Sequence, residues 1–151
     1  QKPQVTMSRI QTRRADYVHF ARFETRWKDN DLYGHLNNVE YYSAFDTVIN
    51  RHLIDAGGLD PHGGEIIGLC VESQCRFHDS FSFPEVIEAG LRVGHLGRTS
   101  ARYELGLFKT GSDVPAAEGH FVHVFVDRAG RRPCPPHEAL RAVLEALLPP
   151  A

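Results

Sequence analysis

The chain has 151 residues, of which 42% are hydrophobic and 24% are charged, and its formal net charge is −2. This length and composition suit one globular domain and give no general attraction to nucleic acid or anionic membranes. No apolar run approaches the length that spans a bilayer, and the N-terminus lacks the pattern of a secretion signal. We expect a flexible arm at residues 1–16, one domain at residues 17–148, and no nucleic-acid or membrane partner.

The cysteines do not form a disulfide framework. There are three of them, Cys70, Cys75 and Cys134, and neither their odd number nor their spacing suits paired bridges or a zinc site. Cys70 and Cys75 fall in a strand-like run, where a buried, inert thiol is the better expectation. We therefore expect a reducing, cytoplasmic compartment and no metal.

Residues 17–27 alternate in polarity, which predicts a β-strand. One side carries the more continuous apolar set, and we expect that side to face the core near Trp27. The set consists of His19, Ala21, Phe23, Thr25 and Trp27.

The stretch that follows leads into a long helix. Asn37 is a good N-cap, and Glu40 stands three residues later, as in a capping box. Helical spacing continues to about Ala56, and Gly57 then ends the helix. The predicted buried stripe is Tyr42, Phe45, Ile49, Leu53 and Ala56.

The helix start brings donors and an acid together. Its first N–H groups have no intrahelical acceptor, and one near Asn38 could stabilise an oxyanion. Gly34 permits a tight turn just before the helix. Asp31 could act there as a general base or as a nucleophile. The simpler alternative is that Asp31 is an ordinary turn residue that favours the helix dipole.

The rest of the chain predicts four more strands and a short helix. Residues 66–77 begin with apolar side chains on both faces, which indicates a central strand buried under the helix. Residues 86–96 and 99–110 form a hairpin, residues 116–127 form a fifth strand, and residues 138–148 form an amphipathic helix.

The turn of this hairpin offers a possible ligand contact. Arg98, Thr99 and Ser100 could bind a phosphate or another polar group of a ligand through charge and hydroxyl groups. The simpler alternative is a solvated surface turn.

The run Asp29-x-Asp31-x-x-Gly34-His35-x-Asn37-Asn38-x-x-Tyr41 resembles the signature of hotdog-fold acyl-CoA thioesterases. It is most similar to the 4-hydroxybenzoyl-CoA thioesterase branch, and the resemblance covers roughly residues 17–130. It implies that Asp31 is the catalytic carboxylate and that the N–H at or next to Asn38 polarises the thioester carbonyl.

The resemblance also implies roles for neighbouring residues. His35 or Asn37 would position water or the carboxylate, and Gly34 would permit close approach. Phe81 and Phe83 would shape the acyl pocket or a dimer contact, unless they only cap the core. Tyr41, which the predicted stripe leaves out, would touch substrate or pack.

The expected fold is α+β, a hotdog fold whose five-stranded antiparallel sheet wraps around one long helix. Such a sheet has an exposed edge, which a homodimer or homotetramer would cover, and the family builds its active sites at that junction. The expected function is hydrolysis of an acyl-CoA or aryl-CoA without a cofactor.

Two alternatives remain open at this point. The first is an acyl-CoA hydratase or dehydratase, in which His35 would work with Asp31 or Asp46. The second is a domain that binds acyl-CoA without turning it over.

Overall fold

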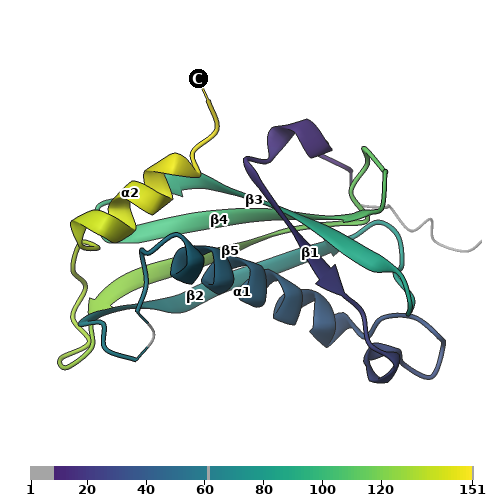
Figure 1. Ribbon diagram of the computed structural model, residues 1–151, viewed down its shortest axis with the longest axis horizontal. Coiled ribbons are helices and arrows are strands. Elements are labelled where there is room, and N and C mark those ends of the chain that lie inside the picture. Colours follow the sequence, from purple (N-terminus) through teal and green to yellow (C-terminus); the bar gives the residue numbers. More distant parts are fainter. Residues whose placement is uncertain (1–8, 61, 151) are drawn as a thin grey trace, which may run out of the picture.

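The computed structural model describes residues 9–60 and 62–150, in which one antiparallel sheet curves around a long helix (Figure 1). The strands lie in the order β1-β3-β4-β5-β2, and this arrangement confirms the predicted hotdog fold. Two short 3₁₀ turns, Arg14–Asp16 and Trp27–Asp29, flank the first strand. The elements are β1 His19–Glu24, α1 Asn38–Asp55, β2 Ile66–Phe77, β3 Val86–Leu96, β4 Ser100–Lys109, β5 Ala117–Asp127 and α2 Glu138–Ala146.

Helix α1 fills the concave side of the sheet through one apolar stripe. The stripe differs slightly from the predicted one, because Tyr41 is buried whereas Tyr42 is only half-buried and Ala56 is exposed. A side chain at position 119 of β5 would collide with this helix, since its Cβ would lie 2.4 Å from the Phe45 ring. The buried residues of α1 are Tyr41, Ala44, Phe45, Val48, Ile49 and Leu53.

The prediction that Trp27 faces the core is wrong. Its side chain is 76% exposed, because β1 ends at Glu24 and the 3₁₀ turn breaks the alternation of the strand. Within β1 the predicted face is confirmed, since Ala21 and Phe23 pack against the core.

Strand β2 lies at the edge of the sheet, so the prediction of a buried central strand is also wrong. It pairs only with β5, from Ile66 opposite Asp127 to Phe77 opposite Ala117, and its register shifts at the middle. Most of its side chains from Cys70 to Gln74 are exposed. The apolar run in the sequence did not reveal that one side of this strand has no partner among the described residues.

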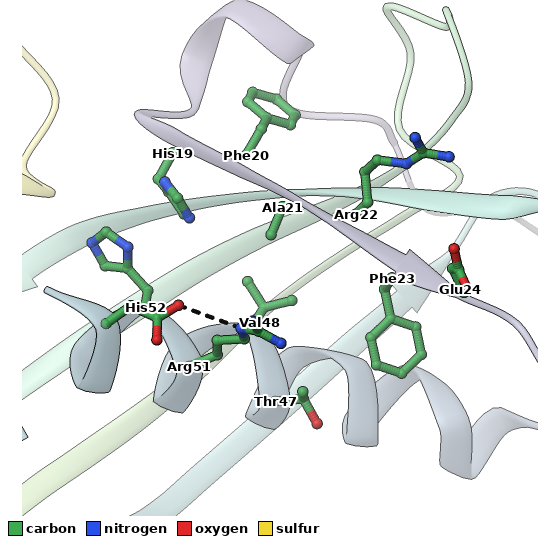
Figure 2. Close-up of a pocket in the computed structure, with 11 residues that line it drawn as sticks. His19, Phe20, Ala21, Arg22, Phe23, Glu24, Thr47, Val48, Arg51 and His52 are labelled. Atoms are coloured by element: carbon green, nitrogen blue, oxygen red, sulfur yellow. Dashed lines mark hydrogen bonds and ion pairs between the residues drawn. The ribbon is translucent and has the colours of Figure 1, made fainter. Parts of the chain in front are cut away.

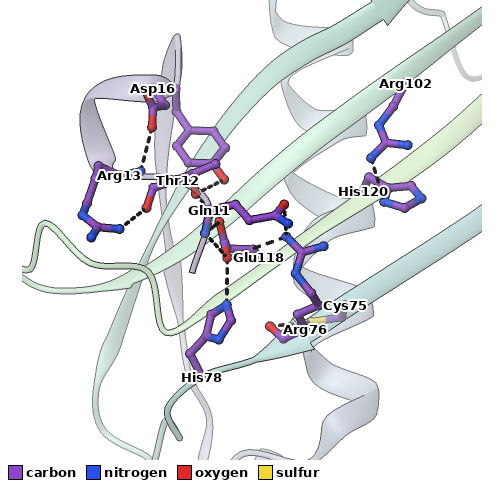
Figure 3. A network of polar contacts seen from close by, with 11 residues as sticks. Gln11, Thr12, Arg13, Asp16, Cys75, Arg76, His78, Arg102, Glu118 and His120 are labelled. Atoms are coloured by element: carbon purple, nitrogen blue, oxygen red, sulfur yellow. Dashed lines mark hydrogen bonds and ion pairs between the residues drawn. The ribbon is translucent and has the colours of Figure 1, made fainter. Parts of the chain in front are cut away.

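The outer face of the sheet carries a buried acid (Figure 3). Glu118 on β5 is only 2% exposed and accepts hydrogen bonds from the Thr12 hydroxyl at 2.5 Å, the Gln11 N–H at 3.1 Å and His78 Nε2 at 2.8 Å. Burial raises the pKa of Glu118, but these hydrogen bonds and Arg76 outweigh it and lower the pKa overall. Part of the expected N-terminal arm therefore lies on the sheet, while residues 1–8 lie outside the described residues.

Helix α2 closes one end of the molecule over the β3–β4 turn (Figure 1). Leu140 and Leu144 are buried against the core, and the Arg141 guanidinium donates to the carbonyls of Gly97 and Arg98 at 3.2 and 3.0 Å. In the part of the chain that the structure describes, neither helix has the length and apolar character needed to cross a membrane.

Candidate active site

The loop between β1 and α1 closes on itself around a four-residue turn. The Asp31 N–H donates to the His35 carbonyl at 2.7 Å, and the Gly34 N–H donates to the Asp31 carbonyl at 3.1 Å. Gly34 has a φ of +77°, in the left-handed region that glycine adopts without strain. The tight turn predicted at Gly34 is therefore confirmed, and its backbone geometry is what requires a glycine.

Asp31 presents one fixed and one available carboxylate oxygen. Its Oδ1 atom accepts the N–H groups of Tyr33 at 2.8 Å and His35 at 3.3 Å. Its Oδ2 atom accepts no hydrogen bond from the described residues, and the side chain is half-buried. The loop thus orients the carboxylate and leaves one oxygen able to attack a carbonyl or to take a proton from water.

Two side-chain contacts hold this loop against the segment before β3. The Ser82 hydroxyl donates to the Gly34 carbonyl at 2.7 Å, and the Phe83 N–H donates to the Asn30 side-chain oxygen at 3.1 Å. The partners are about fifty positions apart in the sequence, so local patterns gave no signal for Ser82 or Asn30.

Asp29, the first acid of the motif, has a structural role. It is 2% exposed and accepts from the Arg26 guanidinium, at 2.8 Å from Nη2, and from the Arg26 N–H at 2.9 Å. The hydrogen bonds from Arg26 hold the pKa of Asp29 below its usual range. The Asp29 carbonyl also accepts the Asn37 N–H at 2.8 Å, so this pair ties the end of β1 to the start of α1.

The start of α1 leaves one backbone donor unpaired. The Asn37 side chain accepts the Val39 N–H at 3.1 Å, and its carbonyl accepts the Glu40 N–H at 2.9 Å. The Glu40 carboxylate, expected to complete a capping box, lies 3.8 Å from the Arg26 guanidinium. The Asn38 N–H has no acceptor among the described residues. A free donor at the positive end of a helix dipole is the group that an oxyanion hole requires.

Apolar side chains surround this loop on the surface. Leu32 is 100% exposed, Tyr33 is 85% exposed, and Val39 is also exposed. The Trp27 ring meets the Phe83 ring edge to face, with 6.0 Å between centroids. A folded chain seldom leaves such a group uncovered unless a ligand or another chain binds there.

The other residues predicted near this site divide into two groups. His35, Asn37 and Phe83 are exposed around the loop. Tyr41 and Phe81 are buried beneath it, and the Tyr41 hydroxyl accepts the Phe81 N–H at 3.3 Å. Substrate contact by Tyr41 or Phe81 stays a prediction, and within one chain both residues support the loop from below.

The β3–β4 turn lies far from Asp31 in the same chain. The loop contacts the segment before β3, whereas Arg98 follows the far end of this 11-residue strand, which spans roughly 35 Å at about 3.3 Å per residue. Arg98 is exposed, and the Thr99 carbonyl accepts the Phe125 N–H at 2.8 Å. One chain therefore does not bring Arg98, Thr99 or Ser100 to the candidate site.

A cleft of about 450 Å³ lies between β1 and α1 and is lined by no residue of the Asp31 loop (Figure 2). The rings of His19 and His52 meet there, with 4.1 Å between centroids. Burial and the neighbouring His19 lower the pKa of His52. This cleft is separate from the candidate site.

The cysteines are all free thiols in the structure. Cys75 is half-buried, and burial raises its pKa to about 12, as expected for an inert thiol. Cys70 is exposed, so its predicted burial is wrong, because it lies on the edge strand. Across residues 9–60 and 62–150, no three His, Cys, Asp or Glu side chains gather as a metal site would require.

The fold and this loop together define a class of protein. A sheet wrapped around a helix, with a carboxylate beside the unpaired start of that helix, is the architecture expected of a hotdog-fold hydrolase. Residues 25–144 match the thioesterase-like superfamily. The chain belongs to this superfamily, and its membership makes it a thioesterase.

Solved structures show the same architecture. The PA5185 protein of Pseudomonas aeruginosa strain PAO1 is 51% identical with a TM-score of 0.90, over 93% of this chain and 98% of that one. The PA2801 protein of Pseudomonas aeruginosa is 26% identical with a TM-score of 0.77, over 85% and 98% of the two chains. A DHNA-CoA thioesterase from Staphylococcus aureus is 17% identical with a TM-score of 0.73, over 84% and 86%, a likeness of fold. Among curated proteins, none matches this sequence.

Proposed function

We propose that this protein hydrolyses the thioester of an acyl-CoA or aryl-CoA, releasing a carboxylic acid and the CoA thiol. One observation carries the proposal: a single loop holds a carboxylate with one oxygen unbound and a helix-start N–H without an acceptor. Thioester hydrolysis needs one group that delivers a nucleophile to the carbonyl carbon and one that stabilises the negative charge developing on the carbonyl oxygen.

In the proposed reaction the thioester carbonyl oxygen accepts the Asn38 N–H. Asp31 either attacks the carbonyl carbon or removes a proton from the water that does. If water attacks, the carbon–sulfur bond of the tetrahedral intermediate breaks, the thiolate takes up the proton that Asp31 removed, and the oxygen of water ends in the carboxylic acid. If Asp31 attacks, the same bond breaks to leave a mixed anhydride, and water then hydrolyses this anhydride and restores the Asp31 carboxylate. Gly34 allows close approach, and the exposed His35 or Asn37 positions the water or the carboxylate. This chemistry needs no metal and no redox cofactor.

We further propose that the active unit is a homodimer, or a tetramer built from such dimers. In the described part of the chain one edge of β2 is unpaired, its Val71 side chain is exposed, and antiparallel pairing with a second β2 would satisfy that edge. Such pairing places the start of β2 in one subunit beside the end of β2 in the other. It would bring residues 98–100 of one chain toward the loop of the other, where they would bind CoA. The three free cysteines favour a reducing, cytoplasmic location.

The test is release of the CoA thiol from a panel of straight-chain, branched and aryl thioesters. Asp31→Asn should lower kcat by about 10² or more, because the amide cannot act as nucleophile or base. Asp55→Asn is the matched control, since Asp55 is an exposed acid at the other end of α1, paired with Arg51 at 3.3 Å.

Three results would contradict the proposal. Hydrolysis by Asp31→Asn at the wild-type rate would remove this carboxylate from the mechanism. Loss of enoyl-CoA absorbance without thiol release would indicate a hydratase. Tight CoA-ester binding with no turnover of any thioester would indicate a binding domain.

A further inference from the structure

Beneath α1, on the side that faces β2, there is a second, smaller hollow of about 120 Å³. Its walls come from the last turns of α1 and from the inner faces of β2 and β5. It is somewhat smaller than the roughly 150 Å³ cavity that can hold benzene, so it suits the end of a chain or of a small ring. Most of its lining is apolar, and its polar side chains are Asn50, His123 and Arg128, of which His123 is the buried one.

His123 is a buried polar side chain without a hydrogen bond. It is 5% exposed, and no described residue donates to it or accepts from it. The Tyr103 ring packs against the imidazole edge to face, with 5.0 Å between centroids, and the buried Tyr103 hydroxyl also has no partner. Only the Tyr103 hydroxyl of this pair is fully enclosed, whereas the imidazole nitrogens can be reached from the hollow, where a polar ligand group could satisfy them.

The imidazole can offer both a donor and an acceptor. Burial lowers the pKa of His123, while the charge of Asp46 opposes this shift. The ring is therefore neutral near pH 7, with one N–H and one lone pair in its plane. A neutral hydroxyl, which both donates and accepts, matches this ring better than a hydrocarbon does.

Gly68 on β2 leaves the imidazole uncovered. A Cβ at this position would lie 3.0 Å from His123 Nδ1 and 3.5 Å from the Phe125 ring, so a side chain there would crowd the imidazole. Gly68 does not have a positive φ, and its backbone conformation therefore does not demand glycine. The missing side chain instead keeps a path to His123 open at the edge strand.

The proposed dimer places this hollow beside the other chain's reaction site. Antiparallel pairing of two β2 strands sets the beginning of one strand beside the end of the other. Gly68 lies near the beginning, whereas Phe77 lies at the end and packs on Tyr41 of the first α1 turn, with 4.8 Å between ring centroids. Each hollow then faces the start of α1 in the partner, where the thioester carbonyl would be held.

We infer that His123 is a specificity residue, which hydrogen-bonds an uncharged polar group, such as a hydroxyl, near the far end of the acyl chain. This inference rests on the proposed function, because it assigns the acyl end of the same site. The Tyr103 ring packs edge to face against the imidazole, and the lack of a side chain at Gly68 leaves space for the end of the acyl chain. The hollow thus selects a hydroxylated acyl chain over a plain chain of the same length.

The test compares matched pairs of straight-chain and ω-hydroxyacyl-CoA thioesters from butanoyl to octanoyl. At one chain length the wild type should favour the hydroxylated member by about tenfold in kcat/KM, the effect of one hydrogen bond. His123→Leu should bring this ratio close to one while changing kcat/KM for the plain substrate by no more than about threefold. His123→Gln retains a donor and an acceptor and should keep part of the preference. His52→Leu, in the other cleft, is the matched control and should leave the ratio unchanged.

Each contrary result has a separate meaning. If His123→Leu lowers kcat/KM by the same factor for both members of every pair, the residue is structural and the inference is overturned. A wild-type preference for the plain member at every length also overturns it, although thioester hydrolysis itself would stand. If the wild type hydrolyses none of these thioesters or those of the wider panel, the proposed function fails, and this inference fails with it.

Discussion

The Asn38→Pro substitution isolates the backbone N–H proposed as the oxyanion donor. Asn38 is the first residue of α1, a position where proline is favoured because its fixed φ suits the helix. Asn37 has φ −62° and ψ 140°, the extended conformation that a following proline requires. Since the Asn38 N–H has no acceptor in the described residues, the substitution breaks no hydrogen bond there.

The expected result is an enzyme that folds but works slowly. Loss of one oxyanion donor should lower kcat by about 10²–10³, which corresponds to roughly 2.7–4 kcal/mol of transition-state stabilisation. The free energy of unfolding should stay the same or rise by up to about 1 kcal/mol, because proline restricts the unfolded chain. Thiol-release kinetics and urea unfolding measure the two quantities on the same preparation.

Glu138→Pro is the matched control for this substitution. Glu138 is the first residue of α2, and His137 before it is also extended, with φ −64° and ψ 167°. The same chemical change away from the Asp31 loop should leave kcat unchanged. If Asn38→Pro retains full activity while it remains folded, the Asn38 N–H is not the oxyanion donor and the reasoning is refuted.

Three further predictions concern stability. Glu118→Gln should destabilise the fold by about 2–4 kcal/mol at pH 7, because it weakens a buried, hydrogen-bonded carboxylate. The folded-state pKa of Glu118 is lowered, so the stability that the carboxylate contributes is complete above its ordinary pKa of about 4.3 and is lost as the pH falls through the lowered pKa. Urea unfolding at several pH values should therefore show a smaller difference in unfolding free energy between wild type and variant at acidic pH. A difference that stays constant with pH would contradict this prediction. Gly119→Ala should lower Tm and destabilise by about 1–3 kcal/mol, because the new Cβ would lie 2.3 Å from the Gln74 carbonyl oxygen of β2 and 2.4 Å from the Phe45 ring; an unchanged Tm would show that both the strand and the helix can move aside. Asp29→Asn should lower the free energy of unfolding by roughly 1.5–3 kcal/mol, because it weakens the hydrogen bonds from Arg26, and it should lower kcat because the loop is held less firmly. An unchanged free energy of unfolding in urea would count against this structural role.

The sequence by itself determined most of the secondary structure. The predicted helix from Asn37 or Asn38 to Ala56 is observed as Asn38–Asp55, and the strand predicted at residues 66–77 is observed as Ile66–Phe77. These elements depend on local signals, namely the spacing of apolar residues, an N-cap and a terminal glycine. The same local signals predicted a candidate site at Asp31 and the start of the helix.

The tertiary structure alone decided what surrounds each element. In the fold, β2 lies at an edge of the sheet, Trp27 is exposed, and the β3–β4 turn lies at the other end of the molecule from the loop that carries Asp31. The fold also buries His123 beside a hollow that Gly68 leaves open. Strand order and cross-strand contacts join residues that are far apart in sequence, so the periodicity of a single segment does not encode them. A residue's own pattern predicts helix or strand, but the segments that pack around it determine whether it meets core, solvent or substrate.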